Sequence, residues 1–245
     1  TAALESASLT GEAAELAEKL LKNKDQLGKK VVWLFGGDGW AYDIGYGGLD
    51  HVMASGEDIN VFVVDTEVYS NTGGQSSKAT PTSATAKFAA SGKKVAKKDL
   101  GAILMQYGYV YVAQVAMGAD QAQTLKALRE AESYDGPSIV ICYCPCLEQH
   151  IKAGMGTSQD EMKKAVDCGL WPLYRYDPNK TEKPFSLDYK KPSVPVEEFF
   201  NGEVRYAGLK IKYPETAAKL FAEAQVEADA RYETYVALAH SYNKD

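Results

Sequence analysis

Two short segments of this chain combine apolar runs with oxygen-bearing side chains that could hold a metal ion. Asp38 follows the run at residues 31–35, and Thr66 follows the run at residues 61–65. Apolar runs bounded by glycines predict buried parallel strands, and the stretch between them is long enough for one helical crossover. Because open α/β sheets bind ligands at the carboxyl ends of their strands, we expect Asp38 and Thr66 to meet at one sheet edge.

The residue types at this edge suit a magnesium ion and a diphosphate. Mg²⁺ takes oxygen ligands and is usually held by one or two protein groups together with phosphates, which fits a carboxylate, a hydroxyl and a nearby carbonyl. Gly37 and Gly39 allow the backbone to approach a phosphate closely, and a helix beginning near Tyr42 would direct its positive end at it. The sequence therefore predicts a metal-bridged diphosphate.

These two segments also carry a resemblance to a known family. Residues 36–45 read GGDGWAYDIG and residues 65–81 read DTEVYSNTGGQSSKATP. The order of residues is similar to the thiamine diphosphate motif, in which Gly-Asp-Gly is followed by an Asn after a second strand. More narrowly, the two blocks resemble the C-terminal thiamine-binding part of the pyruvate:ferredoxin oxidoreductase family, and the similarity extends from about residue 30 to residue 178.

The resemblance implies roles for individual residues. Asp38, Thr66 and the Val68 carbonyl would hold Mg²⁺, and Asn71 would touch the diphosphate or the reacting centre as a catalytic residue, with a local turn cap as its alternative. The alternative to a cofactor contact is, for Trp40, that its ring only fills the core. For Glu67 the alternative is that its side chain faces solvent. The expected cofactor-lining set is Gly37, Asp38, Gly39, Trp40, Thr66, Glu67, Val68, Tyr69, Ser70 and Asn71.

The run Cys142-Tyr143-Cys144-Pro145-Cys146 does not have the Cys-x-x-Cys spacing of zinc ribbons. Free cysteine is among the most buried residue types, so Cys142 and Cys144 read as buried structural thiols, as does Cys168. The resemblance implies a 4Fe-4S cluster near the thiamine, with three ligands from upstream sequence and Cys146 as the fourth.

The resemblance further implies an enzyme that oxidatively decarboxylates pyruvate to acetyl-CoA and CO₂, with electrons passing through iron-sulfur clusters to ferredoxin or flavodoxin. Thiamine diphosphate carries the chemistry and the protein positions it. Coenzyme A, the remaining domains of the same enzyme and a second copy in a homodimer are the other expected partners.

Two other functions remain open at this stage. The glutamate that activates thiamine lies on a separate domain, so the isolated chain could be a noncatalytic module that holds cofactor and cluster. Gly-Gly-Asp-Gly also occurs in NAD and lipid kinases, but there Thr, Ser or Asn follows where this chain has Trp40.

Composition excludes several classes of protein. The chain has 245 residues, of which 45% are apolar and 24% charged, with a net charge of −6. These values fit a globular domain and not a basic nucleic-acid-binding one.

Four cysteines without a signal segment favour the cytoplasm. The chain starts at Thr1 and not at Met, and the resemblance implies a far longer polypeptide, so we expect a fragment. The uncharged stretch 100–119 contains Gln and Tyr and reads as a strand, not as a membrane span.

The hydrophobic pattern predicts an α/β fold, a doubly wound parallel sheet of the thiamine diphosphate-binding type with a C-terminal helical extension. Two domains are expected, residues 1–178 and residues 179–245. The second would hold an arm and one long amphipathic helix, 214–242. Strands are expected at 31–35, 60–65, 109–115 and 138–143, and helices at 12–24, 42–55, 99–107, 120–132 and 159–168.

Residues 66–97 read as a long functional loop with a short helix near 84–90. Its end carries the basic cluster Lys93, Lys94, Lys97 and Lys98. A solvated face is one interpretation of this cluster. Electrostatic steering of an acidic electron carrier or of coenzyme A phosphates is the other.

Overall fold

The computed structural model describes residues 2–243 and separates into two compact units that divide between Val32 and Trp33. The first unit contains α1 (Ala2–Glu5), α2 (Glu12–Lys22) and the short 3₁₀ helix η1 (Lys24–Gln26). The helix predicted at 12–24 is confirmed. The second unit contains the sheet and all other elements of the described chain.

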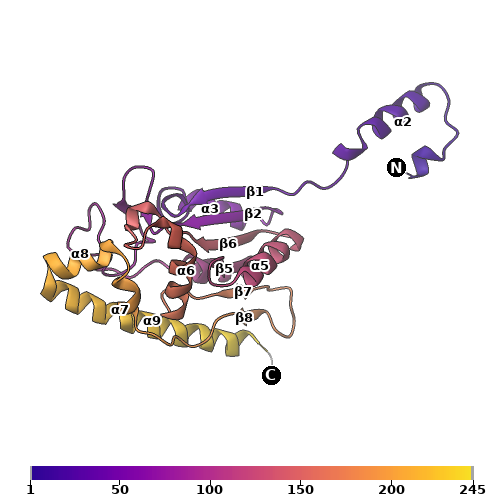
Figure 1. The fold of residues 1–245 in the computed structure, drawn as a ribbon. Helices are drawn as coiled ribbons and strands as arrows, with labels where there is room; N and C mark the ends of the chain where they lie inside the picture. Colours follow the sequence, from indigo (N-terminus) through magenta and orange to yellow (C-terminus); the bar gives the residue numbers. More distant parts are fainter. Residues whose placement is uncertain (1, 244–245) are drawn as a thin grey trace. The chain divides into compact units, whose positions relative to one another are not determined.

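The sheet of the second unit has the strand order β1-β2-β6-β5-β7-β8 (Figure 1). The first four strands of this order run parallel and confirm the predicted core. β7 and β8 are antiparallel additions at one edge. Only residues 177–184 join these two strands, too few for the helical crossover that a parallel pair needs. The strand bounds are β1 (Trp33–Gly37), β2 (Asn60–Asp65), β5 (Tyr111–Val115), β6 (Ser138–Tyr143), β7 (Tyr174–Tyr176) and β8 (Phe185–Leu187).

Helices cover both faces of this sheet, as expected for a doubly wound fold. Alternate residues of β5 separate the faces: Tyr111 and Ala113 pack with α5 (Gln121–Ser133), whereas Val112 belongs to the larger core on the other side. That larger core includes residues of α3 (Tyr46–Ala54), α4 (Leu100–Met105) and α6 (Ser158–Asp167). The period-2 alternation of strand side chains builds both cores from the same strands.

The chain after β1 forms two helical pieces where one helix was predicted at 42–55. A π-helix, η2 (Gly39–Ile44), precedes α3, and Gly45 lies between them. A Cβ at Gly45 would lie 2.2 Å from the Trp40 ring, so the close approach of the indole requires glycine at this junction.

The long loop after β2 contains the short hairpin β3 (Val68–Tyr69) and β4 (Gln75–Ser76). The helix predicted near 84–90 was wrong. In its place Phe88 adopts a left-handed conformation with φ 67°, and Ala86 pairs with Ala89 across a turn. The alanine-rich composition favoured a helix, but backbone bonds to Gly74 and Lys93 hold this segment in an irregular path.

The C-terminal region belongs to the same core as the sheet. The predicted long helix is confirmed as α9 (Pro214–Tyr242), which runs beside β8 and α8 (Figure 1). Residues 179–243 thus join the unit that begins at Trp33, and the predicted domain boundary after residue 178 does not coincide with a division between compact units. The division into two domains therefore stays a prediction. The remaining elements are η3 (Leu147–Gln149), η4 (Met155–Thr157), α7 (Val196–Phe200) and α8 (Val204–Lys212).

No helix within residues 2–243 is both long and apolar enough to cross a membrane. The uncharged stretch at 100–119 forms α4 and the buried strand β5.

Candidate functional site

Three neighbouring strands end at one edge of the sheet and deliver the predicted site residues there. Asp38 follows β1, Thr66 follows β2, and Cys146 lies three residues beyond β6. Because β1, β2 and β6 are consecutive in the sheet and parallel, their carboxyl ends lie together.

The three predicted magnesium ligands converge on one hydroxyl group. The Thr66 Oγ1 lies 2.9 Å from Asp38 Oδ1 and 3.1 Å from the Val68 carbonyl oxygen. The Ser70 hydroxyl lies 2.7 Å from the same Oγ1. A threonine hydroxyl has a single proton to donate, so the carboxylate and the carbonyl compete for it. The site therefore concentrates acceptor oxygens that a cation would satisfy together.

Asp38 is buried and held in place by donors on both carboxylate oxygens. The Ser77 hydroxyl donates to Oδ2 at 2.8 Å, and the Thr66 backbone N–H donates to Oδ1 at 3.2 Å. Burial raises the pKa of Asp38, and the bond from Ser77 and the charge of Lys97 oppose that effect. A desolvated carboxylate of this kind gains from a nearby cation.

The donor set fits a hard cation. One carboxylate, one hydroxyl and one carbonyl are the oxygen ligands that Mg²⁺ accepts when phosphates and water complete its shell. Within residues 2–243, no group of three or more His, Cys, Asp or Glu side chains gathers as a metal site.

The glycines predicted to line the cofactor lie in different surroundings. Gly37 is exposed at the end of β1, and the nearest atom to an added Cβ is the Val64 carbonyl oxygen at 4.0 Å. Gly39 is buried at the start of η2, and its added Cβ would meet the Tyr69 ring at 2.3 Å. Trp40 is half-buried and packs against the larger core, in accord with its core-aromatic interpretation.

Asn71 and Glu67 differ sharply in exposure. Asn71 is exposed in the turn after β3. Glu67 is buried, so its solvent-facing alternative was wrong: the side chain contacts Lys97 and Arg205. The backbone of Glu67 lies in the turn 66–68, between the candidate magnesium ligands Thr66 and Val68.

The four cysteines are free, and Cys146 is the one that reaches the candidate metal site. Its Sγ lies 3.3 Å from the Ser70 hydroxyl, which in turn contacts Thr66. Cys142 and Cys144, predicted to be buried, are half-buried, as is Cys146. Desolvation raises the pKa of the Cys144 thiol and raises that of Cys142 to about 12. Cys168 is fully buried, as predicted for a structural thiol.

Several side chains of the site were not anticipated. Gln149 donates to the Thr66 carbonyl at 3.0 Å and accepts from the Cys146 N–H, so it ties the strand ends of β2 and β6. Its place three residues after Cys146 has capping-box spacing, a signal that was available in the sequence. Ser77 lay inside the block that carries the family resemblance, yet its bond to Asp38 spans 39 residues and had no local signal.

The basic cluster is largely turned inward. The Lys97 ammonium lies 2.7 Å from Asp65 Oδ2, and its side chain is 11% exposed. Lys93 donates to two backbone carbonyls, and burial lowers its pKa. Lys98 donates to the Tyr42 carbonyl, while Lys94 is exposed. The solvated-face interpretation thus holds for Lys94 and was wrong for Lys93 and Lys97.

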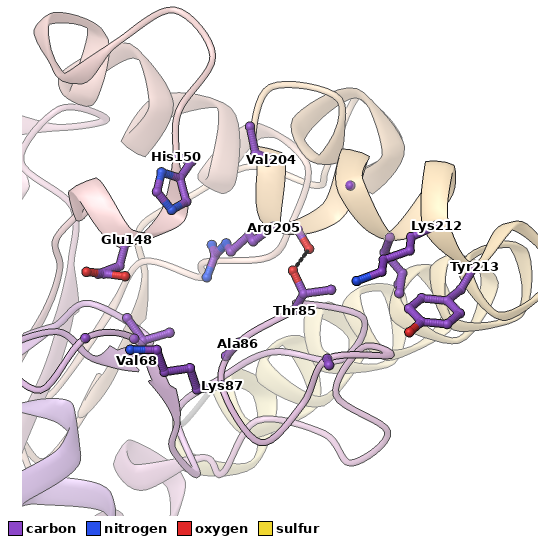
Figure 2. A pocket seen from close by; sticks show the side chains of 15 residues that line it. Val68, Thr85, Ala86, Lys87, Glu148, His150, Val204, Arg205, Lys212 and Tyr213 are labelled. Atoms are coloured by element: carbon purple, nitrogen blue, oxygen red, sulfur yellow. Dashed lines mark hydrogen bonds between the residues drawn. The ribbon is translucent and has the colours of Figure 1, made fainter.

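A pocket of about 470 Å³ opens beside Val68 (Figure 2). Its walls come from the loop after β2, the turn after Cys146 and α8. Figure 2 shows Arg205 projecting from α8 between these walls, with its carbonyl bonded to Thr85. Helix α8 therefore reaches the neighbourhood of the turn 66–68, which carries two of the candidate magnesium ligands.

Comparison with known proteins agrees with this geometry. Residues 11–142 match the family model described as thiamine pyrophosphate enzyme, C-terminal TPP binding domain. The chain is 58% identical over 233 residues to the pyruvate:ferredoxin oxidoreductase of Moorella thermoacetica, which covers 94% of this chain and 20% of that protein. It is 55% identical over 231 residues to the pyruvate-flavodoxin oxidoreductase of Klebsiella pneumoniae, covering 93% and 20%.

The chain thus spans about a fifth of the length of the curated relatives it matches. A solved 2-oxoglutarate:ferredoxin oxidoreductase from Magnetococcus marinus is similar with a TM-score of 0.46 and 23% identity, over 53% of this chain and 44% of that one. A likeness this distant carries no argument. The family match covers more than half of the chain and includes both strand ends that carry Asp38 and Thr66. The chain therefore belongs to the thiamine pyrophosphate enzyme family and corresponds to its C-terminal TPP-binding domain.

Proposed function

We propose that this chain holds the diphosphate and Mg²⁺ end of thiamine diphosphate in an oxidoreductase that converts pyruvate and coenzyme A to acetyl-CoA and CO₂. The observation that carries the proposal is that the Asp38 carboxylate and the Val68 carbonyl both lie within 3.1 Å of the Thr66 hydroxyl. Pyruvate as substrate is supported by the names of relatives that are 58% and 55% identical to this chain.

Each residue at the sheet edge has a task in this proposal. Asp38, Thr66 and the Val68 carbonyl hold Mg²⁺, which offsets the negative charge of the diphosphate. Gly37, Gly39 and the segment 67–70 line the cofactor, and Trp40 supports η2 by packing on Gly45. Asn71, which is exposed beside the turn, would touch the diphosphate or the reacting centre. When bound, thiamine diphosphate supplies the carbon nucleophile for decarboxylation of a 2-oxoacid.

Cys146 is the proposed fourth ligand of a 4Fe-4S cluster whose other ligands lie in upstream sequence. Its 3.3 Å contact with Ser70 supports this assignment, because Ser70 also contacts the Thr66 hydroxyl. A cluster ligated at Cys146 would therefore lie close to the thiamine, as one-electron transfer between them requires.

The names of the relatives support the electron acceptor, and the other partners are part of the same proposal. Ferredoxin or flavodoxin accepts the electrons. The name of the Moorella thermoacetica relative supports ferredoxin, and that of the Klebsiella pneumoniae relative supports flavodoxin. The other domains of the enzyme supply the glutamate that activates thiamine, and the whole is a cytoplasmic homodimer. The noncatalytic-module alternative applies to this chain in isolation, and the family match leaves the kinase alternative without support.

Calorimetric titration of the full-length protein with thiamine diphosphate and Mg²⁺ tests the proposal. Asp38→Asn should weaken binding by roughly 3 kcal/mol, over a hundredfold, because a buried charge partner is lost. Thr66→Val should cost roughly tenfold, since water can replace a neutral ligand. Asp167→Asn, which alters an exposed carboxylate of α6, is the control. Unchanged affinity and unchanged metal dependence in Asp38→Asn would remove the basis of the proposal.

A further inference from the structure

The metal-binding turn depends on an unusual backbone conformation at Glu67. This residue has φ 63°, in the left-handed region that residues with a Cβ rarely adopt. The reversal at Glu67 brings the Val68 carbonyl back to within 3.1 Å of the Thr66 hydroxyl. A strained conformation of this kind persists only where the surroundings over-determine it. The question is what holds Glu67 in place.

Every polar group of Glu67 is fixed by a residue outside the turn or at its start. Its N–H donates to Asp65 Oδ1 at 3.0 Å, and its carbonyl accepts from the Thr80 hydroxyl. The carboxylate is held from two sides. Oε1 lies 3.5 Å from the Lys97 ammonium, and Oε2 accepts a 2.7 Å bond from Arg205 Nη2.

Arg205 is itself immobilised, although it is 138 residues away in sequence. Its side chain is 2% exposed, and its Nε pairs with the buried Glu203. Its carbonyl accepts bonds from the Thr85 N–H at 2.9 Å and from the Thr85 hydroxyl at 2.7 Å (Figure 2). Both ends of Arg205 are therefore anchored, and its bond to Glu67 fixes the turn against α8.

We propose that Arg205 is a positioning residue for the metal site: through the Glu67 carboxylate it clamps the turn 66–68 in the one conformation that aims the Thr66 hydroxyl and the Val68 carbonyl at the same point. This inference rests on the proposed Mg²⁺-diphosphate function of that site. Groups that orient metal ligands without touching the metal commonly change its affinity by 10- to 100-fold. Lys97 shares the task from the opposite side of the Glu67 carboxylate.

Calorimetric titration of Mg²⁺ at saturating thiamine diphosphate tests the clamp in the full-length protein. Arg205→Gln and Glu67→Gln should each raise the Mg²⁺ Kd by about tenfold or more. The double variant should lose little beyond either single variant, because both changes break the same bond. Glu67→Gly should also weaken Mg²⁺ binding. Glycine accepts the left-handed backbone without strain, so wild-type affinity in Glu67→Gly would show that the carboxylate is not needed.

Arg175 provides a matched control. It is also buried and pairs with two carboxylates, Glu130 and Asp188, but it lies on β7, separated from β2 by two strands. Arg175→Gln should lower thermal stability and leave the Mg²⁺ Kd at the wild-type value. Hydrogen exchange without cofactor should show faster exchange of the amides at 66–70 in Arg205→Gln and not in Arg175→Gln.

The outcomes separate the clamp from the function on which it rests. If Thr66→Val weakens Mg²⁺ binding while Arg205→Gln and Glu67→Gln keep the wild-type Kd, the clamp is wrong and the metal site stands. If Thr66→Val also keeps the wild-type Kd, the metal site itself is wrong. Should Arg205→Gln fail to fold, Glu67→Gln decides, because it leaves Arg205 paired with Glu203.

Discussion

At the scale of single residues, the three cysteines after β6 differ in what surrounds each sulfur. Cys146 Sγ contacts the Ser70 hydroxyl, whereas the hydrogen bonds of the Cys142 and Cys144 thiols go to backbone carbonyls. Burial raises the pKa of both Cys142 and Cys144. The contact with Ser70 is what distinguishes Cys146 as the proposed cluster ligand.

Cys146→Ser in the full-length enzyme should perturb the cluster nearest the thiamine and leave thiamine diphosphate binding intact, because the proposed Mg²⁺ ligands lie on β1 and β2. Cys142→Ser and Cys144→Ser should keep the iron content and cost only roughly 1 to 3 kcal/mol of stability from burying a hydroxyl. Iron analysis and low-temperature paramagnetic resonance distinguish the variants. Normal signals in Cys146→Ser with loss in Cys144→Ser would identify a different ligand.

At the scale of elements, the site is built by register. β1 and β2 pair from Trp33 with Asn60 to Gly37 with Val64, so the residues that follow both strands emerge at the same height. The π-helix η2 then starts directly after Asp38, and its first residue lies against the Tyr69 ring of β3. Strand ends, π-helix and hairpin thus meet without an intervening loop.

Alanine substitutions at the two glycines that flank Asp38 should separate two effects: overlap of the added methyl group with a neighbouring side chain, and its overlap with the bound cofactor. Gly39→Ala should cost roughly 1 to 3 kcal/mol of stability without cofactor, because its Cβ would overlap the Tyr69 ring. Gly37→Ala has open space and should leave this stability unchanged while weakening thiamine diphosphate binding. Thermal unfolding and cofactor titration measure the two effects. Equal cofactor affinity in Gly37→Ala and wild type would contradict close approach of the phosphate at this residue.

At the scale of the whole molecule, the C-terminal helices complete the core that supports the site. Ala217, Leu220 and Phe221 of α9 are buried in the same cluster as the strands of the sheet. Tyr235 donates to Asp99, the N-cap of α4, at 2.7 Å. Since α8 carries Arg205 and packs on α9, the stability of α9 is linked to the position of the proposed clamp.

Substitutions on two sides of α9 test whether its buried face holds the helix in place. Phe221→Ala should destabilise the packing of α9 by roughly 3 to 5 kcal/mol and speed the exchange of its amides. Val226→Ala changes a side chain that is 67% exposed and should alter stability by less than about 0.5 kcal/mol. Hydrogen exchange of the full-length protein, resolved to α9 peptides, provides the measurement. Identical exchange in the two variants would mean that α9 does not depend on its buried face.

The sequence alone determined the parallel core and the candidate metal ligands. Apolar runs and helical periods are local properties, so β2, β6 and α9 could be predicted almost to the residue, and the oxygen-bearing residues after two such runs had to meet at one edge. Boundaries near glycine were less certain: β1 begins two residues later than predicted, and the helix after it is broken at Gly45.

The tertiary structure decided what the local pattern does not encode. The pairing of β7 with β5, the bond from Ser77 to Asp38 and the inward turn of Lys97 all join residues that are far apart in the chain. The bond between Glu67 and Arg205 spans 138 residues, and neither residue has a neighbour that predicts it. Buried ion pairs form only where folding removes both charges from water at the same place, so their partners depend on the packed molecule and not on sequence spacing.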